Sequence, residues 1–466
     1  MMLPVLNSRS TYPRIQQVVE QDMCIACGAC VYACPQDVVV PTYNSLRAAH
    51  EIRIADKTYC PTCAAPCDAV CPSIQVDLVG LLPDARNGDG AIDRHGVVQS
   101  VHIGYAPAHQ FNGVSSSGGV LRCFVSHALE TGTPVVCLGQ VGDDYEPMIA
   151  RSLADLQRVP GSIYHSVSFA KCITVLRALD EPCVLVSIPC HLEGILTYIR
   201  KHEPALEEKI ALNVGLICGW MYSGHGIRAF AHHKALPGRV VDAAYRGEDK
   251  VGLLKLKTDL GVYRFSRRSF SGLGGELDYK SSFSGVVNRL RCRLCENHLN
   301  VLADVVVGDA WLKRKPKATD KLSIVVTRTD RGSAALNKLV TMRKVVLEEG
   351  TIEDIEESQS YNLIHGVVAG KLNRFLQERG RLTPQFDYGD GPRHTSLTVA
   401  ERIDFGFEIA LRRLLRSGQY RAYRAMYVLF RWRLFGGKVK ARVFRFCKKR
   451  YRRTLEFIGE RFGRGG

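Results

Sequence analysis

Two cysteine runs near the amino terminus have the types and spacing of iron–sulfur ligands. The first run places Cys24, Cys27 and Cys30 at intervals of three and adds Cys34 four positions later, directly before a proline. Three thiolates at this spacing can bind one face of a 4Fe-4S cubane, while the fourth reaches a second cluster. A structural zinc site is the alternative, although such sites usually pair two distant halves. The spacing favours 4Fe-4S ligation.

The second run is one residue longer between its second and third cysteines. Its members are Cys60, Cys63, Cys67 and Cys71, and Pro72 follows the last of them. By the crossover rule for two-cluster ferredoxins, Cys71 completes the first cluster and Cys34 the second. The extra residue leaves a lone zinc or a degenerate site open as the alternative to the second cluster. The whole region resembles a bacterial two-cluster ferredoxin.

Four further cysteines stand in contexts that suit a ligand. They are Cys190, Cys218, Cys292 and Cys295. Cys190 follows the strand-like run 183–188 and Cys218 closes the run 210–218, and ligands gather at the carboxyl ends of strands in open α/β sheets. Spacing alone leaves these four open, because a buried free cysteine is commonly just a small apolar residue. We interpret the five remaining cysteines as such small apolar residues: Cys123, Cys137, Cys172, Cys183 and Cys447.

A loop rich in serine and glycine opens directly onto a helical pattern that begins near Val120. Its residues are Ser115, Ser116, Ser117, Gly118 and Gly119. Small residues let a backbone approach a phosphate, and the unpaired N–H groups at a helix start favour negative charge. The loop therefore suits a diphosphate, with an ordinary turn and N-cap as the alternative.

Short apolar runs alternate with helical patterns in the region that must position these groups. The pattern predicts a helix over 120–129 followed by a strand over 135–138, and a helical stretch over 192–201 between the runs 183–188 and 210–218. This alternation predicts an α/β core. Residues 335–380 give no clear pattern.

We expect four parts along the chain. A ferredoxin-like α+β 4Fe-4S module spans 15–80, a linker rich in Gly, Asp and Asn spans 81–100, an α/β core flavoprotein domain spans 101–395, and a basic helical tail spans 396–466.

The net charge of +17 belongs almost entirely to the tail. Residues 401–466 contain 19 Lys and Arg against 5 Asp and Glu, a net charge of +14, which leaves +3 for the first 400 residues. A nucleic-acid-binding protein would carry its positive charge over a binding domain, so we expect no nucleic-acid partner. The tail suits contact with an anionic membrane surface or an acidic protein, and packing on the body is the alternative.

The amino end has no apolar segment of the secretory type, and no apolar run is long enough to span a bilayer. We therefore expect a cytoplasmic protein, where clustered cysteines are more often ligands than disulfides. Peripheral contact at the inner face of the membrane stays open.

In the order of several motifs, the sequence resembles the beta-subunit family of coenzyme F-420 hydrogenases and dehydrogenases. The matching segments are 115–132, 161–179, 188–195, 215–220 and 292–311. The resemblance implies an iron–sulfur flavoprotein that holds FAD beside a 4Fe-4S cluster. It assigns that third cluster to Cys190, Cys218, Cys292 and Cys295. His191 departs from the family, where glutamine is common.

The same resemblance implies which residues contact the flavin. They are the loop Ser115–Gly119, the pair Asp304 and Asp309 of an Ala-Asp…Gly-Asp signature, and, as secondary candidates, Ser162, Tyr164 and Ser166. Turn and capping roles are the alternative for the two aspartates. Lys280 and Arg289 are candidates for contact with an anionic substrate.

These features predict an iron–sulfur flavoprotein oxidoreductase. Such a protein would pass electrons between a two-electron carrier and a protein partner, such as ferredoxin or a partner oxidoreductase subunit. The resemblance implies that the carrier is coenzyme F-420 or a similar compound. One alternative is a ferredoxin-dependent flavin reductase of another organic substrate. Another is an electron-transfer adaptor without flavin. The sequence carries none of the H-E-x-x-H, G-x-S-x-G or Walker motifs, which disfavours hydrolases.

Overall fold

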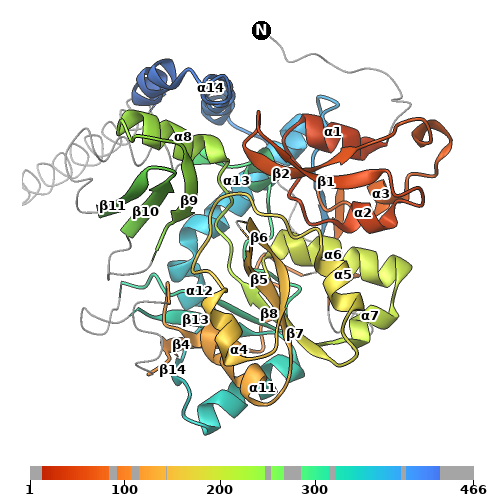
Figure 1. Ribbon diagram of the computed structural model, residues 1–466, viewed down its shortest axis with the longest axis vertical. Helices are drawn as coiled ribbons and strands as arrows, with labels where there is room; N and C mark the ends of the chain where they lie inside the picture. The colour runs from red at the N-terminus through yellow and green to blue at the C-terminus, as the bar shows by residue number, and fades with distance from the viewer. Residues whose placement is uncertain are drawn as a thin grey trace, which may run out of the picture.

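The computed structural model contains a mixed eight-stranded sheet at its centre (Figure 1). It describes residues 13–82, 92–107, 115–142, 144–246, 253–266, 285–313, 321–389 and 395–430. In sheet order the strands are β14 (Val346–Glu349), β4 (Ser100–Tyr105), β13 (Ser323–Thr327), β12 (Val305–Asp309), β8 (Ile210–Leu216), β7 (Cys183–Ser187), β5 (Val135–Val141) and β6 (Asp144–Ala150). The four strands β12, β8, β7 and β5 are parallel, and antiparallel strands flank them on both sides.

Helices cover both faces of this sheet, as buried parallel strands require. On one face lie α4 (Val120–Glu130) and α11 (Asp330–Thr341), and on the other α5 (Cys172–Arg177), α6 (Pro189–His202) and α7 (Ala205–Glu208). Successive residues of β7 serve the two faces: Val184 packs in the cluster under α4, and Leu185 in the cluster under α6. The predicted α/β core, with its helices near 120–129 and 192–201 and its strands, is present.

The amino-terminal module shares its hydrophobic core with the main domain. It contains α1 (Arg14–Glu20), α2 (Ala29–Ala33), the hairpin of β1 (Val39–Asn44) and β2 (Ala49–Ile54), α3 (Pro66–Ala69) and β3 (Gln75–Asp77). Ile15 and Met23 belong to the same buried cluster as Leu192 and Ile195 of α6. In addition, β3 pairs in parallel with β15 (Gln385–Asp387), far along the chain. The module therefore folds as part of the body.

A smaller antiparallel sheet lies beside α8 (Gly224–His233). Its strands are β9 (Val240–Ala244), β10 (Leu253–Thr258) and β11 (Gly261–Ser266). Phe230 of α8 packs against Phe265 with ring centroids 5.1 Å apart. The chain also forms short helical turns: η1 (Cys60–Thr62), η4 (Leu153–Gln157), η6 (Gly285–Val287) and α10 (Leu290–Arg293).

Two long stretches differ from the sequence-based expectations. Residues 335–380, which show no clear pattern, fold into the end of α11, β14, α12 (Ile352–Ser358) and α13 (Ser360–Gln377). The predicted linker 81–100 is not an exposed tether at its described ends, since Leu81, Leu82 and Ile92 are buried. Residues 83–91 lie outside the described part of the chain.

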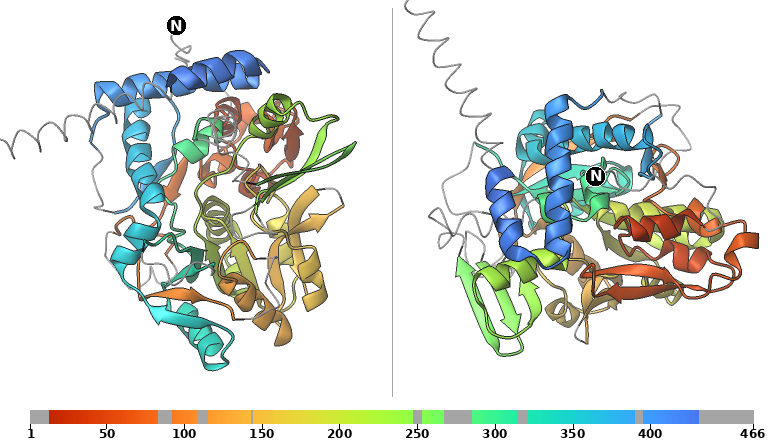
Figure 2. Two further views of the ribbon diagram at one scale, coloured as in Figure 1. Left: turned by 90° about the vertical axis from the view of Figure 1, so that its left-hand side faces the viewer. Right: turned by 90° about the horizontal axis from the view of Figure 1, so that it is seen from above.

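The described part of the basic tail packs on the body. Helix α14 (Val399–Arg416) lies across the end of α13 (Figure 2), and a second helical segment follows at 420–430. Leu411 and Tyr423 are fully buried against Ala229 and Val287. This is the packed arrangement that the sequence left as an alternative, and residues 431–466 lie outside the described part.

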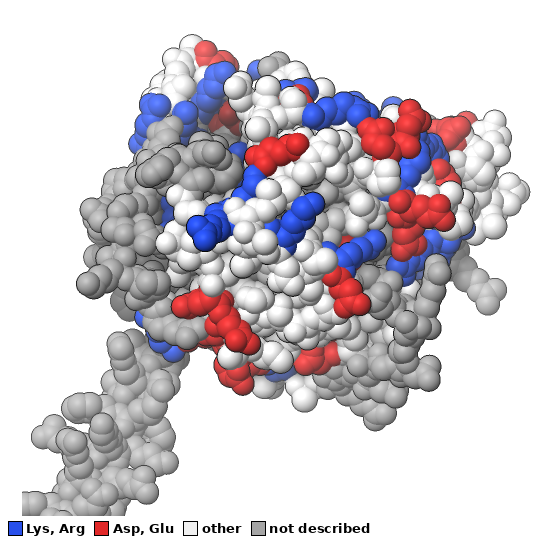
Figure 3. Space-filling view, turned by 90° about the horizontal axis from the view of Figure 1, so that it is seen from below, with Lys and Arg blue, Asp and Glu red and all other residues white. Residues whose placement is uncertain are grey.

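Charges of both signs are interspersed on the face shown in Figure 3, in keeping with a body of small net charge. None of the described helices is both long enough and apolar enough to cross a membrane.

A buried ion pair joins the amino-terminal module, the main domain and α14. Asp22 Oδ1 lies 2.9 Å from Arg289 Nε. The two charges are in contact, although the N–H of Arg289 does not point at this oxygen as in a hydrogen bond. Arg416 binds the other carboxylate oxygen of Asp22. The side chains of Asp22 and Arg289 are 4% and 0% exposed. Both charges are therefore held away from water and depend on each other.

Replacing Asp22 with asparagine is expected to destabilise the protein by about 3 kcal/mol, because the Arg289 charge stays buried without its partner. The urea midpoint of the anaerobically purified full chain measures this. The control is Glu378→Gln, which removes one partner of a half-exposed i,i+4 pair with Arg374 and should leave the midpoint unchanged. Equal shifts in the two variants would contradict the account.

Candidate functional site

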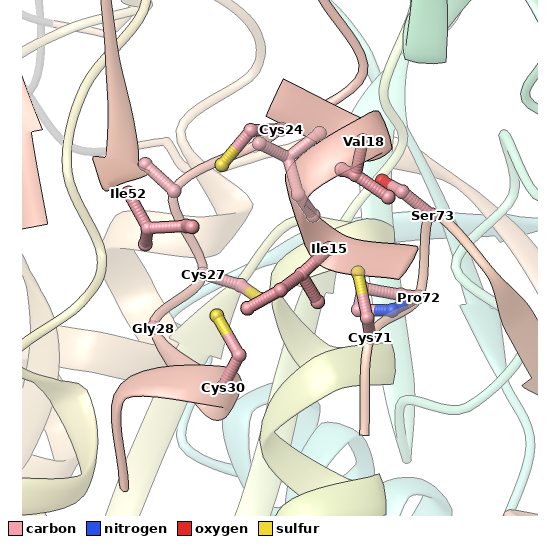
Figure 4. A pocket seen from close by; sticks show the side chains of 12 residues that line it. Ile15, Val18, Cys24, Cys27, Gly28, Cys30, Ile52, Cys71, Pro72 and Ser73 are labelled. Carbon is pink, nitrogen blue, oxygen red and sulfur yellow. The ribbon is translucent and has the colours of Figure 1, made fainter. Parts of the chain in front are cut away.

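Four thiols of the amino-terminal module surround one small cavity. Cys24, Cys27, Cys30 and Cys71 line it together with Ile15, Val18, Ile52 and Pro72. Figure 4 shows the four side chains around a shared interior. These are the cysteines that the crossover rule groups together, and we call them the first set.

The second set lines a separate cavity. Its thiols are Cys34, Cys60, Cys63 and Cys67, with Val39, Ile54, Tyr59 and Pro66 among the other lining residues. Helix α2 connects the two sets, because it carries Cys30 and ends at Cys34 one turn later. The extra residue between Cys63 and Cys67 is accommodated ahead of α3, where Ala65 has a left-handed φ of 52°.

The backbone near Cys27 is shaped by a close approach to the main domain. Gly28 has a φ of +83°, and a Cβ at this position would lie 2.3 Å from the Cα of Ala170. The neighbouring amide of Phe169 donates to the carbonyl of Ala26 at 2.9 Å. Glycine at position 28 is thus required by both conformation and space, which explains why it stands inside the first run.

Burial makes these thiols unfavourable places for negative charge. Burial raises the pKa of Cys27 to about 12, and it raises the pKa values of Cys24 and Cys30 in the same way. Four thiolates can share such a cavity only when a cation offsets their charge. In the described part of the chain, no three His, Cys, Asp or Glu side chains converge on the position of one metal ion. The thiols of each set line a cavity, which suits a multi-atom iron–sulfur cluster.

The core set consists of four of the eight cysteines in the main domain: Cys190, Cys218, Cys292 and Cys295. Cys190 lies in the first turn of α6, which follows β7, Cys218 follows the adjacent parallel strand β8, and Cys292 lies in α10. Burial raises the pKa of Cys218 well above its usual range, and the neighbouring Cys292 and Cys295 raise it further. Cys190 is likewise influenced by Cys218 and Cys292. The four thiols are therefore electrostatic neighbours, as expected for one ligand set.

The serine- and glycine-rich loop ends at the start of α4 without a side-chain cap. Gly119 is the N-cap residue, with a φ of 82°. The hydroxyl of Ser115 is buried and has no hydrogen-bond partner among the described residues. Ser116 Oγ accepts from the amide of Ser162 at 3.2 Å, so two of the sequence-predicted segments lie side by side. Ser117 differs, because its hydroxyl donates to the carbonyl of Leu322 at 2.8 Å.

Tyr164 and Asp309 meet through a residue that the sequence did not single out. The guanidinium of Arg246 donates to Asp309 Oδ2, and Tyr164 is also a hydrogen-bond partner of this guanidinium. The ring of Tyr164 packs edge-on against Tyr245, with centroids 5.4 Å apart. Asp309 ends β12, so this group lies at the carboxyl edge of the parallel strands.

Asp304 does not join the other candidate flavin residues. It precedes β12, at the opposite end of that strand from Asp309, and it is 0% exposed. Its carboxylate accepts from the amide of Asn213 at 2.7 Å, from Thr329 at 2.9 Å and from Arg331 at 2.6 Å. Protein groups thus occupy both oxygens, and Asp304 is structural, which is the alternative that the sequence left open.

The expectation for Arg289 was wrong for a similar reason. This side chain is 0% exposed, pairs with Asp22 and donates to the carbonyl of His50 at 3.3 Å. It is therefore not available to a substrate. Lys280 lies outside the described residues.

Sequence reasoning also missed a buried pair, Glu193 and Arg291. Both stand close to cysteines of the core set, at positions that look ordinary in the sequence. Their side chains are 0% and 1% exposed and form an ion pair of 3.0 Å. The signal was a charged residue on an apolar helix face, since Glu193 lies among the buried residues of α6.

Two family models match segments of the chain. Residues 180–353 match the family model for the C terminus of the coenzyme F420 hydrogenase/dehydrogenase beta subunit, and residues 18–40 match the model of a 4Fe-4S binding domain. The F subunit of F(420)H(2) dehydrogenase from Methanosarcina mazei is 22% identical over 330 residues, which are 69% of this chain and 83% of that protein. The sequence-based identification of the family is confirmed.

One similar solved structure is the F420-reducing [NiFe] hydrogenase complex from Methanosarcina barkeri, studied with xenon. The match to one of its chains has a TM-score of 0.43 and 17% identity, and it covers 61% of this chain and 93% of that chain.

The crossed grouping of the two amino-terminal runs gives a direct prediction. Cys71→Ala should remove a ligand of the first set although Cys71 belongs to the second run, and Cys34→Ala should do the converse. Electron paramagnetic resonance of the reduced full chain should therefore show a changed first centre in one variant and a changed second centre in the other. The control is Cys123→Ala, a buried thiol outside all three sets. Loss of the second centre in Cys71→Ala would contradict the grouping.

Proposed function

Because the chain belongs to the family of coenzyme F420 hydrogenase/dehydrogenase beta subunits, whose members are iron–sulfur oxidoreductases, we propose that it passes electrons between a two-electron carrier and a protein partner. The carrier is coenzyme F420 or a similar compound. FAD and three 4Fe-4S clusters connect the carrier to the partner.

The observation that carries this proposal is the arrangement of the thiols in three neighbouring sets. Helix α2 joins the second set to the first, and α6 carries both Cys190 of the core set and, one turn later, Gly194, which abuts Cys27 of the first set. Each 4Fe-4S cluster transfers one electron at a time, and a chain of adjacent clusters suits transfer over distance. A flavin exchanges two electrons with the carrier and releases them singly to such a chain.

The FAD diphosphate is proposed to bind at the loop Ser115–Gly119. The uncapped first turn of α4 provides amide donors, the unpartnered hydroxyl of Ser115 provides another, and Lys321 lies near because its ammonium donates to the Ser115 carbonyl at 2.7 Å. Ser162 lies beside the loop. These donors and the positive charge of Lys321 together favour binding of the doubly negative diphosphate.

The flavin ring is proposed to lie toward Tyr164 and Asp309, with Arg246 between them. This group and Cys218 both lie at the carboxyl edge of neighbouring strands, β12 and β8, which supports a flavin next to the core set.

Coenzyme F420 is the proposed carrier because the relative from M. mazei is named for its reduced form. A partner oxidoreductase subunit is the proposed exchange partner, with ferredoxin as the simplest substitute. The second set is the proposed point of exchange, because Cys63 is the least buried thiol of the amino-terminal sets and Tyr59 beside it is 51% exposed. Residues of the tail beyond 430 are a further candidate contact for an acidic partner.

The test is to mix the anaerobically purified full chain with reduced coenzyme F420. The flavin absorbance should bleach and the iron–sulfur absorbance should then fall, because electrons pass from the carrier through the flavin to the clusters. A protein that contains the clusters but no extractable flavin would overturn the flavin assignment and leave an adaptor. A flavin that stays oxidised with reduced F420 but is reduced through ferredoxin would indicate another organic substrate.

The diphosphate loop is tested separately by Ser115→Ala. Loss of one hydroxyl donor to a charged group should weaken FAD retention by about tenfold, measured by flavin release on dilution. Ser126→Ala, which removes another buried hydroxyl from α4 itself, is the matched control and should retain FAD as the native protein does. Equal retention in both variants would exclude Ser115 from the site.

A further inference from the structure

A buried ion pair lies where the core set meets the first set. Arg291 Nη2 is 3.0 Å from Glu193 Oε2, and Asn297 donates to the other carboxylate oxygen at 2.9 Å. Neither charged side chain is more than 1% exposed. Removing two charges from water is costly even when they are paired, and an apolar pair of similar size often serves stability as well. Stability alone therefore gives a weak reason for this pair.

Both residues of this ion pair are close in sequence to cysteines of the core set. Glu193 stands three residues after Cys190 on α6, and Arg291 directly precedes Cys292 on α10. The charge of Arg291 acts on the thiols of Cys190 and Cys295. Glu193 also acts on Cys190 and Cys218. A centre bound by these cysteines therefore has one fixed positive and one fixed negative charge at its edge.

The same two residues contact the first set on their other side. Arg291 donates from Nε and Nη2 to the carbonyl of Pro72, at 3.3 and 3.1 Å, and Pro72 follows Cys71 and lines the first cavity. Glu193 influences Cys27 electrostatically. The pair thus bridges the ligand loops of two cavities.

Gly194, next to Glu193, brings the two sets into contact. A Cβ at this position would lie 2.7 Å from Cys27 Sγ. Side chains four residues apart on a helix are neighbours, so the Cβ of Cys190 lies no more than about 9 Å from Cys27 Sγ. The absence of a side chain at Gly194 permits this short separation.

One nitrogen of Arg291 has no hydrogen-bond partner among the oxygen and nitrogen atoms of the described residues. This atom, Nη1, is buried, and the guanidinium that carries it lies against the Cys295 thiol. A buried N–H without an acceptor is unfavourable, and a sulfur atom of a bound cluster would supply one. Arg291 is therefore placed to donate a hydrogen bond to a cluster bound by the core set.

We propose that Glu193 and Arg291 are positioning residues for electron transfer between the core set and the first set, which hold the two sets in contact and fix the reduction potential of the core centre. The inference rests on the proposed function, since it requires a 4Fe-4S cluster at each set. In the transfer step one electron leaves the core centre, which is oxidised by one unit, and enters the first centre, which is reduced by one unit. No proton moves and no bond is made or broken.

The two charges act on the core potential in opposite directions. A reduced cluster is more negative than an oxidised one, so the positive Arg291 favours reduction and the negative Glu193 opposes it. Glu193→Gln keeps the shape of the side chain and removes the negative charge. At a fixed solution potential it should raise the ratio of reduced to oxidised core centre about tenfold, which corresponds to about 59 mV for one electron.

The experiment is a potentiometric titration of the anaerobically purified full chain, followed by electron paramagnetic resonance, for the native protein and the variants. Arg291→Gln should lower the same ratio about tenfold, opposite in sign to Glu193→Gln. Glu203→Gln, which changes an acidic residue at the far end of α6 that pairs with Arg177, should leave the ratio unchanged.

Iron and flavin contents of each variant separate this inference from the proposed function. If both variants contain as much iron and flavin as the native protein, and their ratios of reduced to oxidised core centre shift in opposite directions, the proposal is supported. If the contents are native but the ratio does not shift, or shifts in the same direction in both variants, the proposal is overturned and the proposed function stays intact. If Arg291→Gln does not fold, the sign and size of the Glu193→Gln shift alone decide. A native protein without iron at the core set would overturn both.

Discussion

The burial of thiol groups against α6 is the constraint on which the rest of the structure depends. The first set lies in the same hydrophobic cluster as Ile195 and Ile199 of α6, so the main domain packs against the segments that hold its cysteines. Thiolates in such surroundings require a cation, and metal binding is therefore linked to folding. The close approach of Gly28 to Ala170 and of Gly194 to Cys27 shows how little space separates the parts.

Buried charges occur at the joints between parts. Asp22 and Arg289 connect the module to the segment before Cys292, and Glu193 and Arg291 connect the two ligand sets. A buried charge without its partner is strongly destabilising, so each pair forms only when both chain segments are in place. The two pairs thus favour one relative placement of the cysteine sets, and in the proposed function this placement determines the route of the electrons.

Much of this arrangement can be predicted from the sequence, because it depends on local patterns. Periodicity identifies α4, β5, β7, α6 and β8, and cysteine spacing predicts the crossed grouping of Cys34 and Cys71. Properties set by distant partners are not predictable in this way. Asp304 looks like a ligand residue until Asn213, Thr329 and Arg331 are seen around it. The segment 335–380 obtains its helices from packing on the body, and α13 is the main example.

The central claim is that the three thiol sets each hold a 4Fe-4S cluster. Mössbauer spectroscopy of the ⁵⁷Fe-enriched, anaerobically purified full chain, combined with iron, sulfide and zinc analysis, tests it most directly. The account predicts about twelve iron and twelve sulfide per chain, all in 4Fe-4S form, because each set supplies four thiolates. Zinc in place of iron, or iron without matching sulfide, would contradict it.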